Sequence, residues 1–183
     1  MDLLLLILMV SVLAFAWWGY NSLARLRLLA GNAWADIDVQ LKRRHDLIPG
    51  LVAAVKGHAD YERGTLEDVV RARGEAQAAT GPSASGVAEA ELGSAVQRLL
   101  VLAEAYPDLQ AGMSYLDLQR SLIDLEDHIQ NARRYYNAVV RDYNIRIAQF
   151  PSNLVAGAFR FGPREFFGIE DAAERAVPVV NTR

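Results

Sequence analysis

The chain opens with an unbroken apolar stretch and then changes to a helical alternation of apolar and polar positions. The stretch Leu3–Tyr20 carries no charge. As a helix with a rise of ~1.5 Å per residue it would be about 27 Å long, which nearly matches the hydrocarbon core of a bilayer. We therefore predict a retained, single-pass transmembrane anchor at residues 1–20, in contact with the lipid bilayer, and a body at residues 21–183.

A cleaved secretory signal is the alternative interpretation of the apolar stretch. Residues 14–16 read Ala-Phe-Ala, which is an acceptable small-x-small cleavage site. However, no Lys or Arg precedes the stretch, and cleavage there would leave two Trp at the new terminus. Length and flanking residues therefore favour the retained anchor.

Aromatic and basic residues mark the end of the anchor. Trp17, Trp18 and Tyr20 lie where the aromatic belt of a membrane interface is expected. Arg25 and Arg27 follow shortly after them, whereas no basic residue precedes the span. Since basic flanks favour the cytoplasmic side, we expect the body on the cytoplasmic side of the membrane. A periplasmic or extracellular body is the alternative.

The body has the apolar periodicity of helices. The clearest stripe repeats every three or four residues over four heptads and predicts one helix of about 35 residues that ends at Phe150-Pro151. Its members are Leu118, Leu122, Leu125, Ile129, Ala132, Tyr136, Val139, Tyr143 and Ile147.

Three further helices are expected before this one. The first runs from Tyr20 to about Leu47, and residues 48–50, Ile-Pro-Gly, end or kink it. The second continues from there to about Ala79, residues 80–86 form a loop, and a third helix covers Val87–Ala105. No useful strand pattern appears. We predict an all-α fold, in which a transmembrane helix precedes an antiparallel bundle of about four long helices.

The segment 151–183 differs from the rest of the body because it is irregular and rich in Phe and Gly. Apolar residues are mostly buried in proteins, so we expect this segment to fold back and pack on the bundle. An exposed docking patch is the alternative, because exposed apolar surface is unusual without a partner.

Composition restricts the classes of function. The net charge of −3 argues against a nucleic-acid partner, which would need a basic surface. The absence of Cys excludes disulfides, thiolate metal sites and cysteine nucleophiles. The length of the body suits one domain with a single core.

Candidate chemistry is sparse. His45, His58 and His128 are the only histidines, and no His-Glu-x-x-His or paired Glu-x-x-His motif is present. We therefore predict no catalytic residue, no metal site and no cofactor. A metal-dependent envelope enzyme that uses His45 with Asp46, or His58 with Glu62, is the less favoured alternative.

A polar face of the first body helix is the candidate interaction surface. Spacings of three and four residues place its members on one side of a helix. They are Asn32, Asp36, Gln40, Arg43 and Arg44. Solvated charge is the simplest explanation of Lys42-Arg43-Arg44, and contact with an acidic partner is the alternative.

Several motifs in this order resemble the LemA family. They are Tyr20–Leu23 (YNSL), Asn32–Pro49 (NAWADIDVQLKRRHDLIP), Val55–Gly57 (VKG), Ala103–Leu109 (AEAYPDL), Arg141–Asn144 (RDYN) and Phe150–Ala156 (FPSNLVA). The resemblance covers essentially the whole chain. It implies a bacterial protein with a membrane helix and a bundle of long helices, and it brings no established reaction. Two features differ from the family pattern. The pattern has an aromatic residue at the position of His58 and a His near Tyr61, so the two are exchanged here. The C-terminus also lacks the closing aromatic residue of the family.

The combined expectation is a scaffold or adaptor of the cell envelope, anchored in the bacterial cytoplasmic membrane. Its expected partners are the bilayer and an unidentified envelope or membrane-associated protein, and a homo-oligomer is left open. A ligand-sensing module is the alternative, and a deep apolar pocket with convergent polar groups would favour it.

Overall fold

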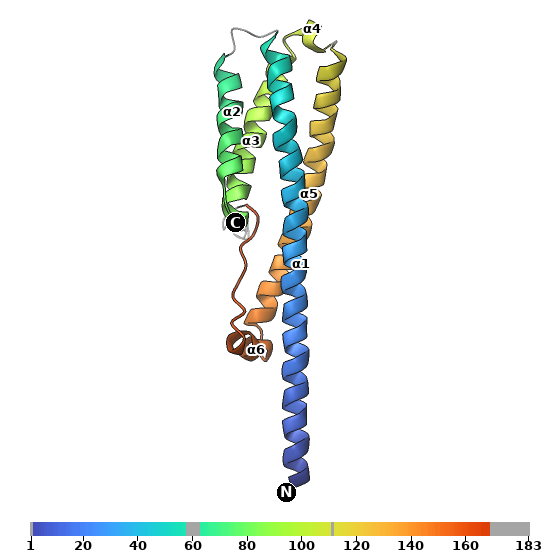
Figure 1. Cartoon of the computed structure of the whole chain (residues 1–183), viewed down its shortest axis with the longest axis vertical. Helices are drawn as coiled ribbons and strands as arrows, with labels where there is room; N and C mark the ends of the chain where they lie inside the picture. Colours follow the sequence, from blue (N-terminus) through green and yellow to red (C-terminus); the bar gives the residue numbers. More distant parts are fainter. Residues whose placement is uncertain (1, 58–62, 111, 169–183) are drawn as a thin grey trace, which may run out of the picture. The chain divides into compact units, whose positions relative to one another are not determined.

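The computed structural model describes residues 2–57, 63–110 and 112–168, and this part of the chain is helical with no strand (Figure 1). The helices are α1 (Asp2–Lys56), α2 (Arg63–Ala78), α3 (Pro82–Ala103), α4 (Pro107–Gln110), α5 (Met113–Ala148) and α6 (Ser152–Ala158). The predicted all-α fold is confirmed. α1 contains a stretch that is long and apolar enough to cross a membrane, and its side chains are mostly exposed.

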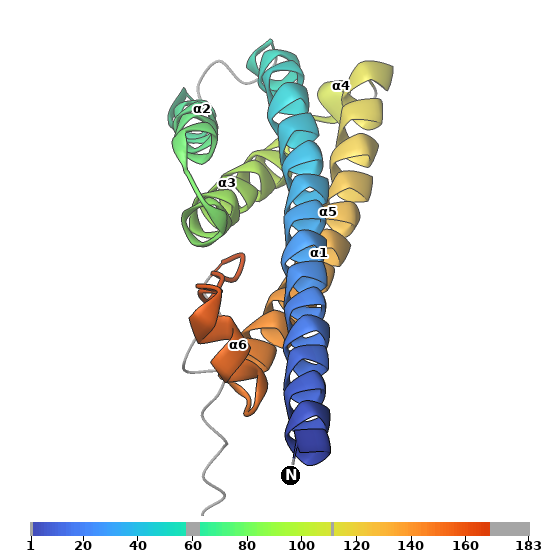
Figure 2. The same cartoon turned by 60° about the horizontal axis from the view of Figure 1, so that its bottom comes forward.

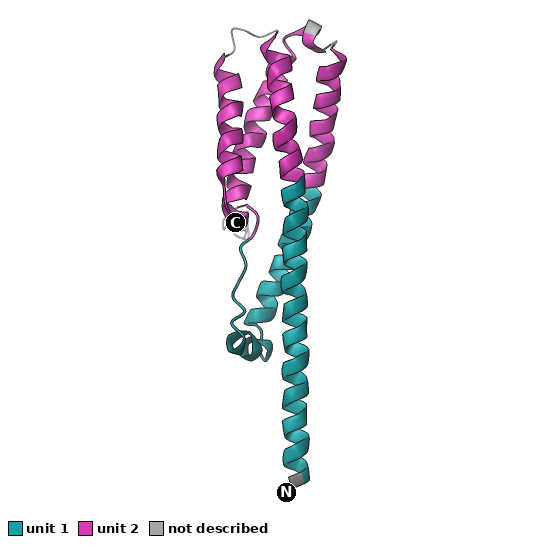
Figure 3. Ribbon diagram, viewed as in Figure 1, with its two compact units in different colours: residues 1–39, 130–165 teal, residues 40–129, 166–183 magenta. Residues whose placement is uncertain are grey.

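The chain divides into two compact units (Figure 3). Unit 1 consists of Met1–Val39 and Gln130–Glu165, and unit 2 consists of Gln40–Ile129 and Phe166–Arg183. The long helices α1 and α5 each contribute residues to both units.

Unit 2 is a bundle in which α2 and α3 lie beside the C-terminal part of α1 and the N-terminal part of α5 (Figures 1 and 2). Among the described residues its core contains fifteen buried apolar side chains, and helices α1 to α5 all contribute to it. Fully buried examples from three helices are Leu51, Val69 and Leu99. The apolar stripes predicted for these helices therefore face the core, as bundle packing requires.

Unit 1 contains the N-terminal part of α1, the C-terminal part of α5, and α6. The long stripe of α5 is buried here at Tyr136, Val139 and Tyr143. A smaller core joins the three helices, with Leu23 on α1 and Tyr143 on α5 in one cluster with Val155 and Ala156 on α6. The helix predicted to end at Phe150-Pro151 ends at Ala148.

Residues 48–50 were expected to end or kink the helix, and an end is wrong, because α1 continues through Pro49 to Lys56. Proline normally disrupts a helix, since it has no N–H to bond the carbonyl four residues earlier. That carbonyl belongs to His45, and the Nε atom of Arg73 donates a hydrogen bond of 2.8 Å to it. A side chain of α2 thus replaces the missing main-chain donor.

Two further boundaries differ from expectation. α3 begins at Pro82 instead of Val87 because proline suits the first turn of a helix, where its missing N–H is not needed. The C-terminal segment is not wholly irregular, since it begins with α6. Its acidic residues after 168 and the Val177-Pro178 ending lie outside the described residues.

Candidate functional site

A buried cluster of charged side chains lies in unit 2. Arg44 and His45 project from α1, and Glu89 projects from α3. Nη1 of Arg44 lies 3.3 Å from Oε2 of Glu89, and Nε2 of His45 lies 2.6 Å from Oε1. Arg44 is 7 % exposed and Glu89 is 4 % exposed. One carboxylate therefore holds two neighbouring residues of α1 inside the bundle.

A second carboxylate and a glycine complete the environment of Arg44. Nη2 of Arg44 lies 3.1 Å from Oε2 of Glu126 on α5, and that side chain is 42 % exposed. A Cβ atom at Gly93 on α3 would lie 2.9 Å from Nη2 of Arg44. The guanidinium is thus held between two carboxylates with a glycine beside it, and a Cβ atom at Gly93 would require the end of the Arg44 side chain to shift.

The charged contacts of this cluster link α1 to α3 inside the bundle. A buried charge is stable only when it is paired and hydrogen-bonded, and Glu89 meets this condition through Arg44 and His45. His45 pairs with Glu89, whereas Asp46 is exposed. The pairing of His45 with Asp46 that an enzyme would use is therefore replaced by a structural contact.

Metal binding receives no geometric support from the described part of the chain. Within it, no group of three or more His, Asp or Glu side chains could hold a metal ion. His58 and Glu62, the other pair considered for an enzyme, lie outside the described residues.

The structure separates the members of the predicted interaction surface. Asn32 and Asp36 are exposed in unit 1, and Arg43 is exposed in unit 2. Gln40 is half-buried, and its Oε1 has no hydrogen-bond partner in the described residues. Arg44 was expected on this surface but is buried, because Glu89 and Glu126 draw it into the bundle. Arg44 is therefore removed from the candidate surface.

The predicted membrane-interface residues contact the C-terminal elements of unit 1. The ring of Trp18 lies 4.7 Å from the guanidinium carbon of Arg146 on α5. The ring of Tyr20 packs edge-on against Phe159 at 4.9 Å and Phe161 at 5.6 Å, measured between ring centroids. Trp17 is exposed. The anchor end of α1 is therefore in contact with the region around α6.

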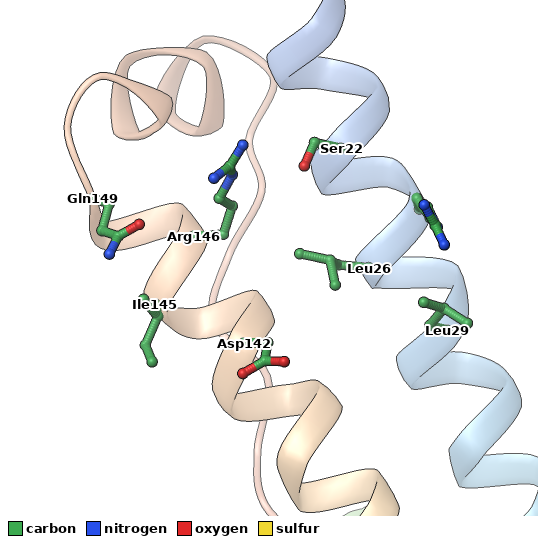
Figure 4. A pocket seen from close by; sticks show the side chains of 8 residues that line it. Ser22, Leu26, Leu29, Asp142, Ile145, Arg146 and Gln149 are labelled. Carbon is green, nitrogen blue, oxygen red and sulfur yellow. The ribbon is translucent and has the colours of Figure 1, made fainter.

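A groove of about 480 Å³ lies between α1 and α5 in unit 1 (Figure 4). Arg146 points from α5 toward Ser22 on α1, and Leu26 lies beside them. The Nε atom of Arg146 is buried with no hydrogen-bond partner in the described residues. The groove is open to solvent, so it does not have the enclosed form of a ligand pocket.

The segment after α6 is held along α5 by side-chain hydrogen bonds. Asn144 donates to the carbonyl of Arg164 at 2.9 Å and accepts from its N–H at 2.9 Å. The hydroxyls of Tyr143 and Tyr136 donate to the carbonyls of Gly162 at 2.9 Å and Glu165 at 2.8 Å. Side chains of α5 thus provide hydrogen-bond partners for the main-chain groups of a segment that forms neither helix nor strand.

Burial raises the pKa of the Tyr136 hydroxyl; the nearby Arg164 opposes this rise and Glu165 adds to it. The hydroxyl therefore stays protonated and can donate its hydrogen bond throughout the neutral range.

Sequence reasoning missed Glu89 and the bonds that hold this segment. A signal for Glu89 was present, since it lies three residues before Leu92 and seven before Val96 on the apolar stripe of α3. A charged residue at such a position indicates a buried partner. The bonds made by Tyr143 and Asn144 had no comparable signal, because they join main-chain atoms that any sequence provides.

Comparison with known proteins identifies a family and several relatives of the chain. The family model described as "LemA family" matches residues 33–181. Magnetosome protein MamQ 2 of Paramagnetospirillum magneticum is 26 % identical over 203 residues, which cover 95 % of this chain and 75 % of the relative. Magnetosome protein MamQ of Magnetospirillum gryphiswaldense is 25 % identical over 205 residues, which cover 96 % and 75 %. Protein LemA of Metamycoplasma hominis is 28 % identical over 156 residues, which cover 84 % and 71 %.

These relatives, the family match and the single N-terminal apolar helix together fit a bacterial membrane protein. The family match covers most of the chain, from within α1 onward. The chain belongs to the LemA family.

Proposed function

We propose that this protein is a membrane-anchored scaffold that binds a membrane-associated protein through the exposed polar face of α1. The observation that carries the proposal is the continuity of α1, because one helix contains both the apolar span and the polar residues. A partner bound to that helix would be held at the membrane without any catalytic step.

Burial supports the choice of surface. Ala33 and Ile37 on α1 are buried, whereas Asn32 and Asp36 on the adjoining face are exposed. Exposed polar groups at these positions are not needed to close a core, so they are available to a partner. The relatives named as magnetosome proteins support a role in an assembly at a membrane.

The test compares two aspartates on one helix. Asp36 and Asp38 are both exposed. Their side chains lie on nearly opposite sides of α1, because each residue turns the helix by about 100° and two residues turn it by about 200°. A photo-crosslinking amino acid would replace each in the full chain in native membranes. We expect Asp36 to yield a crosslinked partner and Asp38 to yield none. Equal crosslinking yields from both positions would refute the proposal. The absence of crosslinks from both positions, in a chain that is folded and inserted in the membrane, would refute it too.

Substitution gives an independent check. Paired Asn32→Ala and Asp36→Ala changes are expected to reduce recovery of the crosslinked partner at least several-fold while the helical circular dichroism is unchanged. Asp38→Ala is the control and should leave recovery at the level of the unsubstituted chain.

We further propose that the body lies on the cytoplasmic side, since Arg25 and Arg27 follow the span and no basic residue precedes it. The chain has no Cys, so a single Tyr135→Cys variant reports the side without background. A membrane-impermeant maleimide should label it in opened cells and not in intact spheroplasts. Labelling in intact spheroplasts would place the body outside.

A further inference from the structure

The region around α6 carries exposed apolar side chains beside the anchor. Phe150 is 77 % exposed, Leu154 is 63 % exposed and Phe159 is 55 % exposed. All three lie within ten residues, and they belong to unit 1 with the apolar span of α1. Clustered apolar side chains that face outward indicate a surface with a partner.

Contacts with α1 fix the level of this region along the span. Gly19 is buried although its neighbours Trp18 and Tyr20 are exposed, and a Cβ atom on it would lie 3.2 Å from Cγ2 of Val155 on α6. Glycine therefore permits α6 to approach α1 at this point. Figures 1 and 2 both show α6 beside α1, with the first helical turns of α1 continuing beyond it.

The end of α6 brings the aromatic residues back to the same level. The chain reverses at Arg160, which has the left-handed φ of 56°, and the N–H of Phe161 donates to the carbonyl of Ala156 at 2.9 Å. This turn places Phe159 and Phe161 against Tyr20, the last residue of the apolar stretch. Residues 155–161 therefore contact the part of α1 where we expect the hydrocarbon to give way to headgroups.

Basic residues outnumber acidic ones around this region, although Asp142 lines the same groove as Arg25 and Arg146. Residues 3–35 and 143–164 contain five Arg and no Asp, Glu or Lys. The arginines are Arg25, Arg27, Arg146, Arg160 and Arg164. The whole chain has a net charge of −3, so the basic residues are concentrated in the part of unit 1 that holds the anchor. Basic residues next to a membrane attract anionic lipid headgroups.

We propose that residues 150–161 form a second membrane contact, in which Phe150, Leu154 and Phe159 enter the interface of the bilayer that α1 spans and the exposed Arg25, Arg27 and Arg160 bind anionic headgroups. The combination of an apolar face and basic flanks is that of an interfacial element. The inference rests on the anchor of the proposed function, but it assigns to the C-terminal elements a contact that the anchor alone does not require.

Single-cysteine variants test the proposal in the full chain, since the natural chain contributes no thiol. Leu154→Cys and Phe159→Cys would carry an environment-sensitive fluorophore in vesicles of phosphatidylcholine and phosphatidylglycerol. We expect strong quenching by a spin label near the lipid headgroup and several-fold weaker quenching by aqueous iodide than at Tyr135→Cys. Tyr135 is the control because it is also exposed and apolar. It lies on α5, fourteen residues before Gln149 and so away from residues 150–161.

A label at Val10→Cys separates failure of this inference from failure of the anchor. If the Val10 label is in lipid and the labels at 154 and 159 are quenched by iodide as strongly as Tyr135, the second contact is refuted and the anchor stands. If the Val10 label is also in water, both are refuted. Labels that are shielded from iodide but not quenched by the lipid spin label would indicate a protein partner or a second copy, which also overturns the proposal.

The contribution of the arginines to lipid binding is measured in a separate experiment. Shielding of the Leu154 label from iodide should increase when phosphatidylglycerol is added to phosphatidylcholine vesicles. Arg160→Gln should reduce that increase, whereas Arg134→Gln, an exposed arginine elsewhere in unit 1, should not. An equal response to phosphatidylglycerol in all three proteins would refute the role of the arginine.

Discussion

The guanidinium of Arg73 donates a hydrogen bond of 2.8 Å from Nε to the main-chain carbonyl of His45. This carbonyl has no helical donor because the residue four positions later is Pro49. The bond explains how α1 passes through a proline without ending, and it makes the stability of α1 depend on α2.

A double-mutant cycle should measure this dependence. Arg73→Met alone is expected to lower the free energy of unfolding by about 1–2 kcal/mol, because a partly buried carbonyl loses its donor. In a Pro49→Ala background the alanine N–H supplies the helical bond, so the same change should cost about 1 kcal/mol less. Denaturation of the full chain in detergent, followed by circular dichroism, gives the four values. Equal costs in both backgrounds would show that the bond does not compensate for the proline.

The carboxylates around Arg44 should differ in their effect on stability. Glu89 is 4 % exposed and pairs with both Arg44 and His45, so Glu89→Gln should lower the free energy of unfolding by about 3 kcal/mol. Glu126 has 42 % of its side chain exposed, and Glu126→Gln should cost less than about 1 kcal/mol. Chemical denaturation of the two variants provides the comparison. Similar losses would mean that burial does not govern these pairs.

Gly86 should be required for docking of the chain near Gly168 in unit 2. A Cβ atom at Gly86 would coincide with the backbone of Gly168, whose N–H lies 3.4 Å from the carbonyl of Pro82. Gly86→Ala should therefore release Phe167 from its buried position, at a cost of about 2 kcal/mol. Chymotryptic cleavage after Phe167 and faster hydrogen exchange of the Gly168 amide would report the release.

Gly74 provides the matched control for this substitution. It lies within α2 of the same unit, and a Cβ atom there would meet nothing within 4 Å. Gly74→Ala should stabilise the helix by about 0.5–1 kcal/mol and leave cleavage at Phe167 unchanged. If Gly86→Ala behaves like Gly74→Ala, the docking described here is incorrect.

Alkaline pH should weaken the contact made by Tyr136. Burial raises the pKa of this hydroxyl, so its ionised form is disfavoured in the folded state. Its contribution to stability is present below the ordinary tyrosine pKa of about 10 and is lost as pH rises through the raised value. Tyr136→Phe should lower stability by about 1 kcal/mol at neutral pH, through loss of the bond to Glu165, and this deficit should shrink above pH ~10. Denaturation across this range, with exposed Tyr135→Phe as control, measures it.

The helices were predictable because their signals are local. Leu122, Ile129 and Tyr136 repeat at helical spacing, and that repeat alone indicates which face of α5 is buried. Continuity through Pro49 was not predictable, because the donor that permits it lies on another helix. The same reason applies to Arg44, whose partner Glu89 is 45 residues away. Periodicity identifies a buried face, but it does not identify the partner that a charged residue finds there.

The hydrogen bond between Arg73 and His45 also imposes an order on biosynthesis. The ribosome releases the anchor and most of α1 before it adds Arg73, so at that stage the His45 carbonyl has no donor from the chain. The carbonyl of His45 gains its side-chain donor only after α2 has been synthesised and packs against α1. A nascent chain that stops before Arg73 therefore has a helix in which the carbonyl opposite Pro49 lacks this donor.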